Sequence, residues 1–125
     1  MNQEDKNLLL KDIYARIPYG VKGCFEGETF STTPLHWYAE NTLEYSVNYM
    51  VIKNGWRPYL FPMSSMTDEQ KEEYHYNCNI GLNRYGDEVH YDSDESIDWL
   101  NAYHFDYRGL IEKGLAIDAT ELNIY

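Results

Sequence analysis

The sequence has little that would connect it to a membrane or a secretory route. It contains no run of roughly 18 apolar residues, the length that a membrane-spanning helix needs. Its first residues, MNQEDKNLLLKD, are acidic and lack the basic and then apolar order of a signal peptide. We therefore expect a cytoplasmic protein without membrane association.

Basic residues are also scarce. Ten Lys and Arg stand against 21 Asp and Glu, which gives a formal net charge of −11. A surface of this charge repels phosphate backbones and anionic lipids, so direct binding to nucleic acid is not expected. If the charge serves binding, the partner is expected to be a basic protein.

Paired cysteines and complete catalytic motifs are missing as well. Cys24 and Cys78 lie far apart without a CxxC pair, so both are predicted to be reduced and structural. The sequence has no phosphate-binding loop, no dinucleotide-binding fingerprint, no GxSxG elbow and no complete set of metal ligands. We predict no metal, no organic cofactor and no catalytic residue, and the oligomeric state stays open.

What is present is typical of a folded α+β protein. A length of 125 residues with 43% apolar residues suits a single domain, residues 1–125. Strand-like segments precede helical ones, an order that favours α+β over alternating parallel units. The prediction is a small antiparallel sheet of about four strands, within residues 19–61. An N-terminal helix and two to three C-terminal helices flank it.

Residues 3–17 are predicted to form the N-terminal helix. Five apolar residues recur at helical spacing: Leu9, Leu10, Ile13, Tyr14 and Ile17. The charged residues of the segment are assigned to its other faces: Lys6, Lys11, Asp12 and Arg16. A proline follows directly and ends the helix, because the residue before proline is pushed out of the helical region.

The clearest strand signal is TLEYSVNYMVI, residues 42–52, with the two-residue period of a half-buried strand. The Asn54-Gly55 pair predicts a tight hairpin turn, and WRPYLF is the returning strand. Pro58 cannot donate a ladder hydrogen bond, so this strand is expected at a sheet edge or a bulge.

The stretch RPYLFPMSSMTDEQKEEY, residues 57–74, joins that strand to a helix. Thr67 and Gln70 make up a capping box, which predicts a helix from Asp68 to about Cys78. The two serines before it belong to the joint and are not expected to be nucleophiles.

Three further elements are predicted in the last third of the chain. NIGLNRYGDEV is punctuated by Gly and Asn and is expected to be a loop. Asp92 and Glu95 form a second capping box, which predicts another helix. A short turn or helix should end at Gly114, before a final strand at residues 115–117.

Acidic residues concentrate at the start of that second predicted helix. Six carboxylates occur within twelve residues without a Lys or Arg among them: Asp87, Glu88, Asp92, Asp94, Glu95 and Asp98. Together with the 13 tyrosines, they suggest an acidic, Tyr-rich face of a non-catalytic module that binds a basic protein. A nucleic-acid-binding protein, covered on its DNA surface, is the natural candidate. The alternative is a solvated surface that only serves solubility.

The competing hypothesis is a small hydrolase-like or metal-dependent enzyme that uses His104, Asp106 and Arg108. His104-x-Asp106 repeats the pattern of His90-x-Asp92, and such residues can bind a divalent metal. Two residues apart, however, share a face only in a strand, and Asp92 is already expected to cap a helix. Structural pairing is therefore the preferred interpretation of these residues.

Two blocks carry a family resemblance: RPYLFPMSSMTDEQKEEY and IDWLNAYHFDYRGLIEKGLAIDAT. Together with the YGVK segment, they resemble a family of short uncharacterised proteins of gut Bacteroidales, their phages and mobile elements. The similarity covers most of the chain and differs at Tyr103, where the family often has a second histidine. The family has no assigned activity, so the resemblance implies only a small intracellular accessory protein linked to a phage or mobile element.

Overall fold

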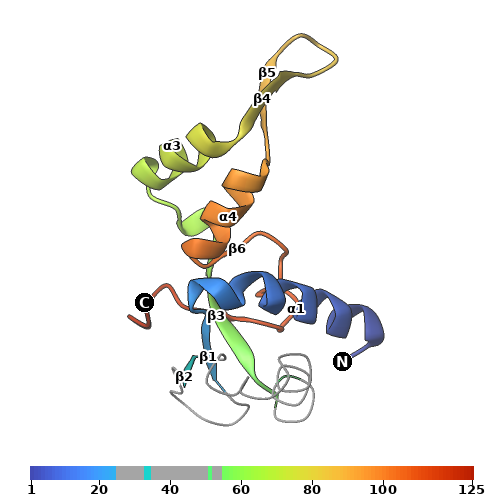
Figure 1. The fold of residues 1–125 in the computed structure, drawn as a ribbon, viewed down its shortest axis with the longest axis vertical. Coiled ribbons are helices and arrows are strands. Elements are labelled where there is room, and N and C mark those ends of the chain that lie inside the picture. The colour runs from blue at the N-terminus through green and yellow to red at the C-terminus, as the bar shows by residue number, and fades with distance from the viewer. Residues whose placement is uncertain (25–32, 35–50, 52–54) are drawn as a thin grey trace.

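The computed structural model describes residues 1–24, 33–34, 51 and 55–125 (Figure 1). The described helices are α1 (Gln3–Arg16), α3 (Asp68–Asn77) and α4 (Asp94–Ala102), with short 3-10 helices at Ile17–Tyr19 and Met63–Ser65. The described strands are β1 (Lys22–Cys24), β2 (Thr33–Pro34), β3 (Arg57–Pro62), β4 (Asn79–Leu82), β5 (Glu88–Tyr91), β6 (Phe105–Asp106) and β7 (Ile117–Asp118). None of the described helices combines the length and apolar character that crossing a membrane would require.

The main sheet confirms the predicted α+β class but is mixed rather than antiparallel. Its order is β2-β1-β3-β6, with β7 also paired to β3. The β1–β2 and β1–β3 pairs are antiparallel, whereas β6 and β7 run parallel to β3. The parallel pairs arise because the chain passes through α3, the β4–β5 hairpin and α4 before it returns to the sheet, and such a crossover permits parallel pairing.

Strand β3 was expected at a sheet edge or at a bulge, and the edge alternative is wrong. It has β1 on one side and the two parallel strands on the other. Pro58 is tolerated because it stands near the beginning of β3, opposite Gly23 of β1. The parallel pairings start only at Tyr59, one residue later.

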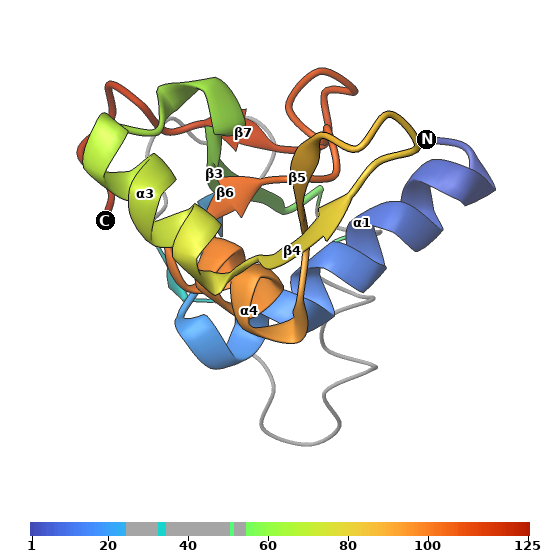
Figure 2. The ribbon, with the colours of Figure 1, turned by 90° about the horizontal axis from the view of Figure 1, so that it is seen from above.

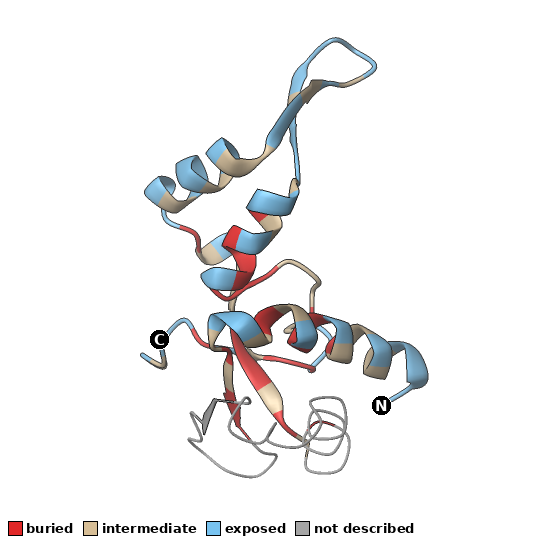
Figure 3. Ribbon diagram, viewed as in Figure 1, coloured by how far each residue is buried: buried red, intermediate tan, exposed pale blue. Residues whose placement is uncertain are grey.

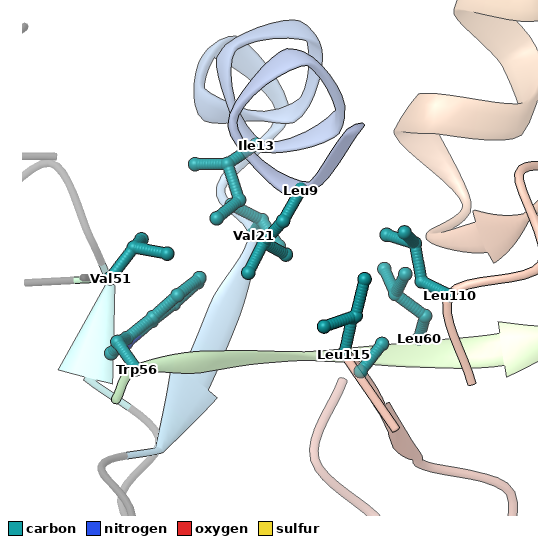
Figure 4. Close-up of a cluster of buried hydrophobic side chains, with 9 residues drawn as sticks. Leu9, Ile13, Val21, Val51, Trp56, Leu60, Leu110 and Leu115 are labelled. Atoms are coloured by element: carbon teal, nitrogen blue, oxygen red, sulfur yellow. The ribbon is translucent and has the colours of Figure 1, made fainter. Parts of the chain in front are cut away.

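The largest core cluster lies between α1 and the sheet (Figure 4). It joins side chains from segments distant in sequence: Leu9, Ile13, Val21, Val51, Trp56, Leu60, Leu110, Leu115 and Ala116. Leu9 and Ile13, which the helical spacing placed on the apolar face of α1, are thus buried as predicted, whereas Tyr14 of the same predicted face is exposed. Val51 is part of this core, whereas the remainder of the predicted strand 42–52 and the Asn54 half of the predicted turn lie outside the described residues.

A second body of the structure consists of α3, the β4–β5 hairpin and α4, with the hairpin extending away from the main sheet (Figure 1). Helices α3 and α4 pack side by side, as the view from above also shows (Figure 2). Met66, just before α3, and Trp99 and Leu100 of α4 pack with Phe105 of the main sheet. We call residues 68–98 the outer lobe.

The hairpin replaces the loop predicted for residues 79–89. Strands β4 and β5 pair from Asn79 with Tyr91 to Leu82 with Glu88. At the turn, the side chain of Asn83 accepts hydrogen bonds from the backbone of Tyr85 and Asp87, and Gly86 adopts a φ of 83°. A glycine with positive φ after a tight turn is a common way to close a hairpin.

The capping boxes were predicted with mixed success. At α3, the backbone N–H of Gln70 donates to the hydroxyl of Thr67, and the Gln70 side chain accepts from the Thr67 backbone, as predicted. Ser65 donates to the carbonyl of Pro62 and so serves the joint before the helix. At α4 the cap is Ser93 with Ser96, one position after the expected Asp92.

Candidate functional site

The six acids predicted to form an interface lie on the β4–β5 hairpin and at the start of α4. All are exposed: Asp87 and Glu88 lie at the hairpin, Asp92 precedes α4, and Asp94, Glu95 and Asp98 belong to α4. The hairpin and the first turns of α4, which carry these residues, are mostly exposed (Figure 3).

Two of these acids have local structural roles. Asp92 accepts hydrogen bonds from the hydroxyls of Tyr74 and Ser96, and so ties α3 to the start of α4. Loss of hydration and then the negative charge of Asp98 raise the pKa of Tyr19, which places Asp98 close to the end of α1. In the described part of the chain, the side chains of the other four acids have no hydrogen-bond or ion-pair partner.

The outer lobe carries most of the charge of the protein. Ten carboxylates and two basic residues, Lys71 and Arg84, give residues 68–98 a net charge of −8, out of −11 for the whole chain. Both ion pairs found among the described residues involve Asp12, which lies outside the lobe. The charge of the lobe is therefore left to solvent or to a partner.

Large apolar side chains are exposed next to these carboxylates. Ile80 and Leu82 of β4 are 64% and 71% exposed, and both point to the same face of the hairpin because side chains alternate along a strand. On the other face, the ring of Tyr91 covers Gly81, where an added Cβ would come within 2.8 Å of it. A two-stranded hairpin that shows apolar side chains to water is marginally stable by itself.

The residues of the enzymatic hypothesis are not brought together around one cavity. The carboxylate of Asp106 accepts the backbone N–H groups of Leu110 and Ile111, both at 2.9 Å, and thereby fixes the turn after β6. Arg108 donates to Asp12 at 2.9 Å. His104 lines a pocket, and neither Asp106 nor Arg108 is among the described residues that line it.

Asp12 and Arg16 of α1 were assigned to the outward faces, and both are in fact fully buried. The guanidinium of Arg16 makes a two-point contact with Asp12, at 2.8 and 3.1 Å, and donates to the carbonyl of Phe105 at 2.6 Å. The ion pair is buried because it faces β6 and Arg108, which the helical spacing of α1 does not reveal. It fastens α1 to the segment that follows α4.

His104 follows α4 in a conformation that histidine rarely adopts. Its φ is 64°, in the left-handed region, where a helix usually ends with glycine. Its side chain is 8% exposed, its Nδ1 is a buried atom without a hydrogen-bond partner, and its ring stacks on Tyr125 at 3.7 Å between centroids. Burial, and then the positive charges of Arg16 and Lys22, lower the pKa of His104 to about 4, so the imidazole is neutral at neutral pH.

The pocket beside His104 has a volume of about 460 Å³. Four aromatic side chains line it: Phe61, Tyr103, Phe105 and Tyr125. Polar side chains come from the 3-10 helix before α3, from the first turn of α3 and from the C-terminal segment: Ser65, Gln70 and Thr120. The sequence did not predict this pocket, because its residues come from separate elements between Phe61 and Tyr125 and no spacing connects them.

The other predicted metal pattern does not form a cluster either. His90 stacks on His75 of α3 at 4.6 Å between ring centroids, while Asp92 faces Tyr74. Among the described residues, no three His, Cys, Asp or Glu side chains are grouped so that they could hold a metal ion. Cys24 is buried, Cys78 is partly buried, and both are free thiols.

Comparisons with protein-family models, with curated proteins and with solved structures give no match for this chain.

Proposed function

We propose that the chain is a non-catalytic protein-interaction module that binds a basic protein through its outer lobe. One observation carries the proposal: on an exposed hairpin that projects from the main sheet (Figure 3), the exposed apolar Leu82 stands opposite the exposed carboxylate of Glu88.

The composition of the lobe suits an interface. Protein interfaces combine an apolar centre with a polar, solvated rim. Ile80 and Leu82 supply an apolar centre on one face of the hairpin, and Glu88, opposite Leu82, begins the acidic rim. Burying the two aliphatic side chains would contribute about 1.5–3 kcal/mol each before the cost of association is subtracted.

The charge of the lobe supports a basic partner. A second copy of the chain would bring another −8 lobe to the same surface, and like charges at close range oppose association. A partner with Lys and Arg around an apolar patch gains attraction instead, and its association should be fast at low salt. A protein that itself binds nucleic acid offers such a surface.

The test is a pair of variants that remove equal charge from different places. In the first, Asp87→Asn, Glu88→Gln and Glu95→Gln neutralise three lobe carboxylates that have no partner among the described residues. The control variant neutralises three exposed glutamates outside the lobe: Glu4, Glu112 and Glu121. Partners captured by the wild type at low salt are identified, purified and measured against both variants.

The proposal expects a basic partner whose Kd rises about tenfold with the lobe variant and stays nearly unchanged with the control. A double change, Ile80→Ser with Leu82→Ser, should weaken the same complex at any salt concentration, because the apolar contribution is not screened. A partner that binds all variants equally well would contradict the proposal.

A further inference from the structure

We propose that the pocket at the base of the outer lobe binds a small, uncharged aromatic molecule that carries an N–H or O–H donor. The pocket goes beyond the proposed function, because none of the six lobe acids lines it. Its volume of about 460 Å³ falls within the usual range for small-molecule sites, about 300–1,000 Å³.

The walls select a flat, apolar body. Phe61 and Phe105 approach each other with ring centroids 6.1 Å apart, and Tyr125 lies 5.9 Å from Phe61. Aromatic rings in these tilted arrangements present faces and edges on which another ring can stack. Tyr103, at the end of α4, adds a fourth ring.

The polar groups of the pocket select a hydrogen-bond donor. The hydroxyl of Ser65 donates to the carbonyl of Pro62, and the hydroxyl of Thr120 donates to Asp118. A hydroxyl whose proton is already used can still accept through its oxygen, so both residues offer acceptors to a ligand. Gln70 uses its Oε1 in the capping box and retains its NH2 as a donor.

The absence of ionic side chains in the wall excludes a charged ligand. No Asp, Glu, Lys or Arg is among the residues that line the pocket in the described part of the chain. A carboxylate or ammonium entering the pocket would lose hydration without a counter-ion in the wall, because Arg16 and Lys22, whose charges act on His104, are not among the lining residues. His104 is neutral at neutral pH and supplies no positive charge.

His104 is a second, independent observation in favour of a ligand. Glycine would satisfy its left-handed backbone at lower cost, yet the position holds a histidine whose side chain is buried and whose Nδ1 has no partner. Backbone strain of this kind clusters at binding and catalytic sites, and a buried polar atom without a partner calls for an explanation.

Tyr125 makes this part of the pocket wall rigid before any ligand enters. Its hydroxyl receives the backbone N–H of Lys22 at 2.8 Å and donates to the carbonyl of Tyr59 at 3.0 Å. The ring, stacked on His104, is thereby anchored to two strands of the main sheet. A preorganised wall reduces the ordering cost of binding.

The experiment uses the full chain labelled with ¹⁵N and three probes. Indole is uncharged, aromatic and has an N–H donor; 1-methylindole lacks the donor; indole-3-acetate adds a negative charge. We expect indole to produce saturable shifts of backbone amides around the pocket, such as those of Ser65, Gln70 and Thr120. The Kd of each of the other two probes should be at least about tenfold higher than the Kd of indole.

Two variants assign the binding to the pocket. Tyr103→Ala removes one wall and should raise the Kd for indole about tenfold, whereas Tyr76→Ala, at a tyrosine that is 88% exposed outside the pocket, should leave it unchanged. Ala102→Trp should fill the pocket and abolish binding, with Lys113→Trp as its control. The dispersion of the amide spectrum shows which variants stay folded.

Three results would overturn the inference. The first is the lack of any saturable shift with indole, and the second is shifts spread over the surface. The third is equal affinity for indole in folded Tyr103→Ala and Tyr76→Ala. Tight binding of indole-3-acetate would refute the claim that the pocket selects uncharged molecules.

Discussion

Replacement of His104 by asparagine should remove a specific loss of stability at acid pH. Asparagine tolerates the left-handed backbone of this position, where φ is 64°, so the change tests the side chain rather than the turn. Burial and the charges of Arg16 and Lys22 lower the pKa of His104 from 6.5 to about 4. Between these two values the unfolded chain binds a proton at His104 and the folded chain does not.

The sign and size of the effect follow from proton linkage. Because the unfolded state holds more protons, the free energy of unfolding falls as the pH decreases from 6.5 to about 4. A shift of this size corresponds to at most about 3.4 kcal/mol, since one pKa unit is about 1.36 kcal/mol. Water in the adjoining pocket screens part of the penalty, so we expect about 2 kcal/mol.

The assay is urea unfolding, followed by tryptophan fluorescence, at a series of pH values between about 7 and 4. The carboxylates titrate in both proteins, so the informative quantity is the difference between wild type and His104→Asn at each pH. That difference should change by about 2 kcal/mol in favour of the variant as the pH falls. The exposed His90, changed to Asn, serves as control. If wild type and His104→Asn lose stability in parallel, the imidazole is not held neutral by burial.

Three substitutions test the interactions that position the site, all by urea unfolding at neutral pH. Asp12→Ala leaves the fully buried guanidinium of Arg16 without its counter-ion and should cost about 3–5 kcal/mol, whereas Lys11→Ala on the exposed side of α1 should cost under about 0.5 kcal/mol. Thr67→Ala removes the α3 capping box and should cost about 1 kcal/mol, and an unchanged midpoint would show that the box is not needed. Gly23→Ala would place a Cβ against a buried tryptophan ring and a strand carbonyl, so a loss of about 3 kcal/mol or more is expected; a smaller loss would mean that β1 can move away.

Features that depend on a few neighbouring residues were predictable from the sequence. The capping box of Thr67 and Gln70 involves groups three residues apart, so the beginning of α3 follows from local chemistry. The spacing of Leu9 and Ile13 likewise identified the buried side of α1. The predicted cap of α4 was one residue too early. Ser93 and Ser96 accept each other's backbone N–H groups, the exchange that was expected of Asp92 and Glu95.

Features that depend on distant residues were not predictable in this way. Strands β6 and β7 have two residues each, too few to show any period, so the parallel half of the sheet left no local signal. Strands β4 and β5 have four residues each, too few for their apolar alternation to stand out from the Gly and Asn residues that indicated a loop. The burial of Arg16 depends on the carbonyl of Phe105, 89 residues away.

The sequence presents His104, Asp106 and Arg108 as one cluster, and the structure gives each of them a different environment. Asp106 fixes a turn by accepting two backbone N–H groups, and Arg108 donates to the carboxylate of the buried Asp12. Both residues therefore stabilise the fold. His104 faces the pocket and a stacked tyrosine instead. Changes at Asp106 or Arg108 should therefore lower the free energy of unfolding and leave the indole affinity of the folded chain within about twofold, because the sites share no contact with the ligand. A joint loss of affinity at all three positions would mean that they act as a unit and would revive the enzymatic hypothesis.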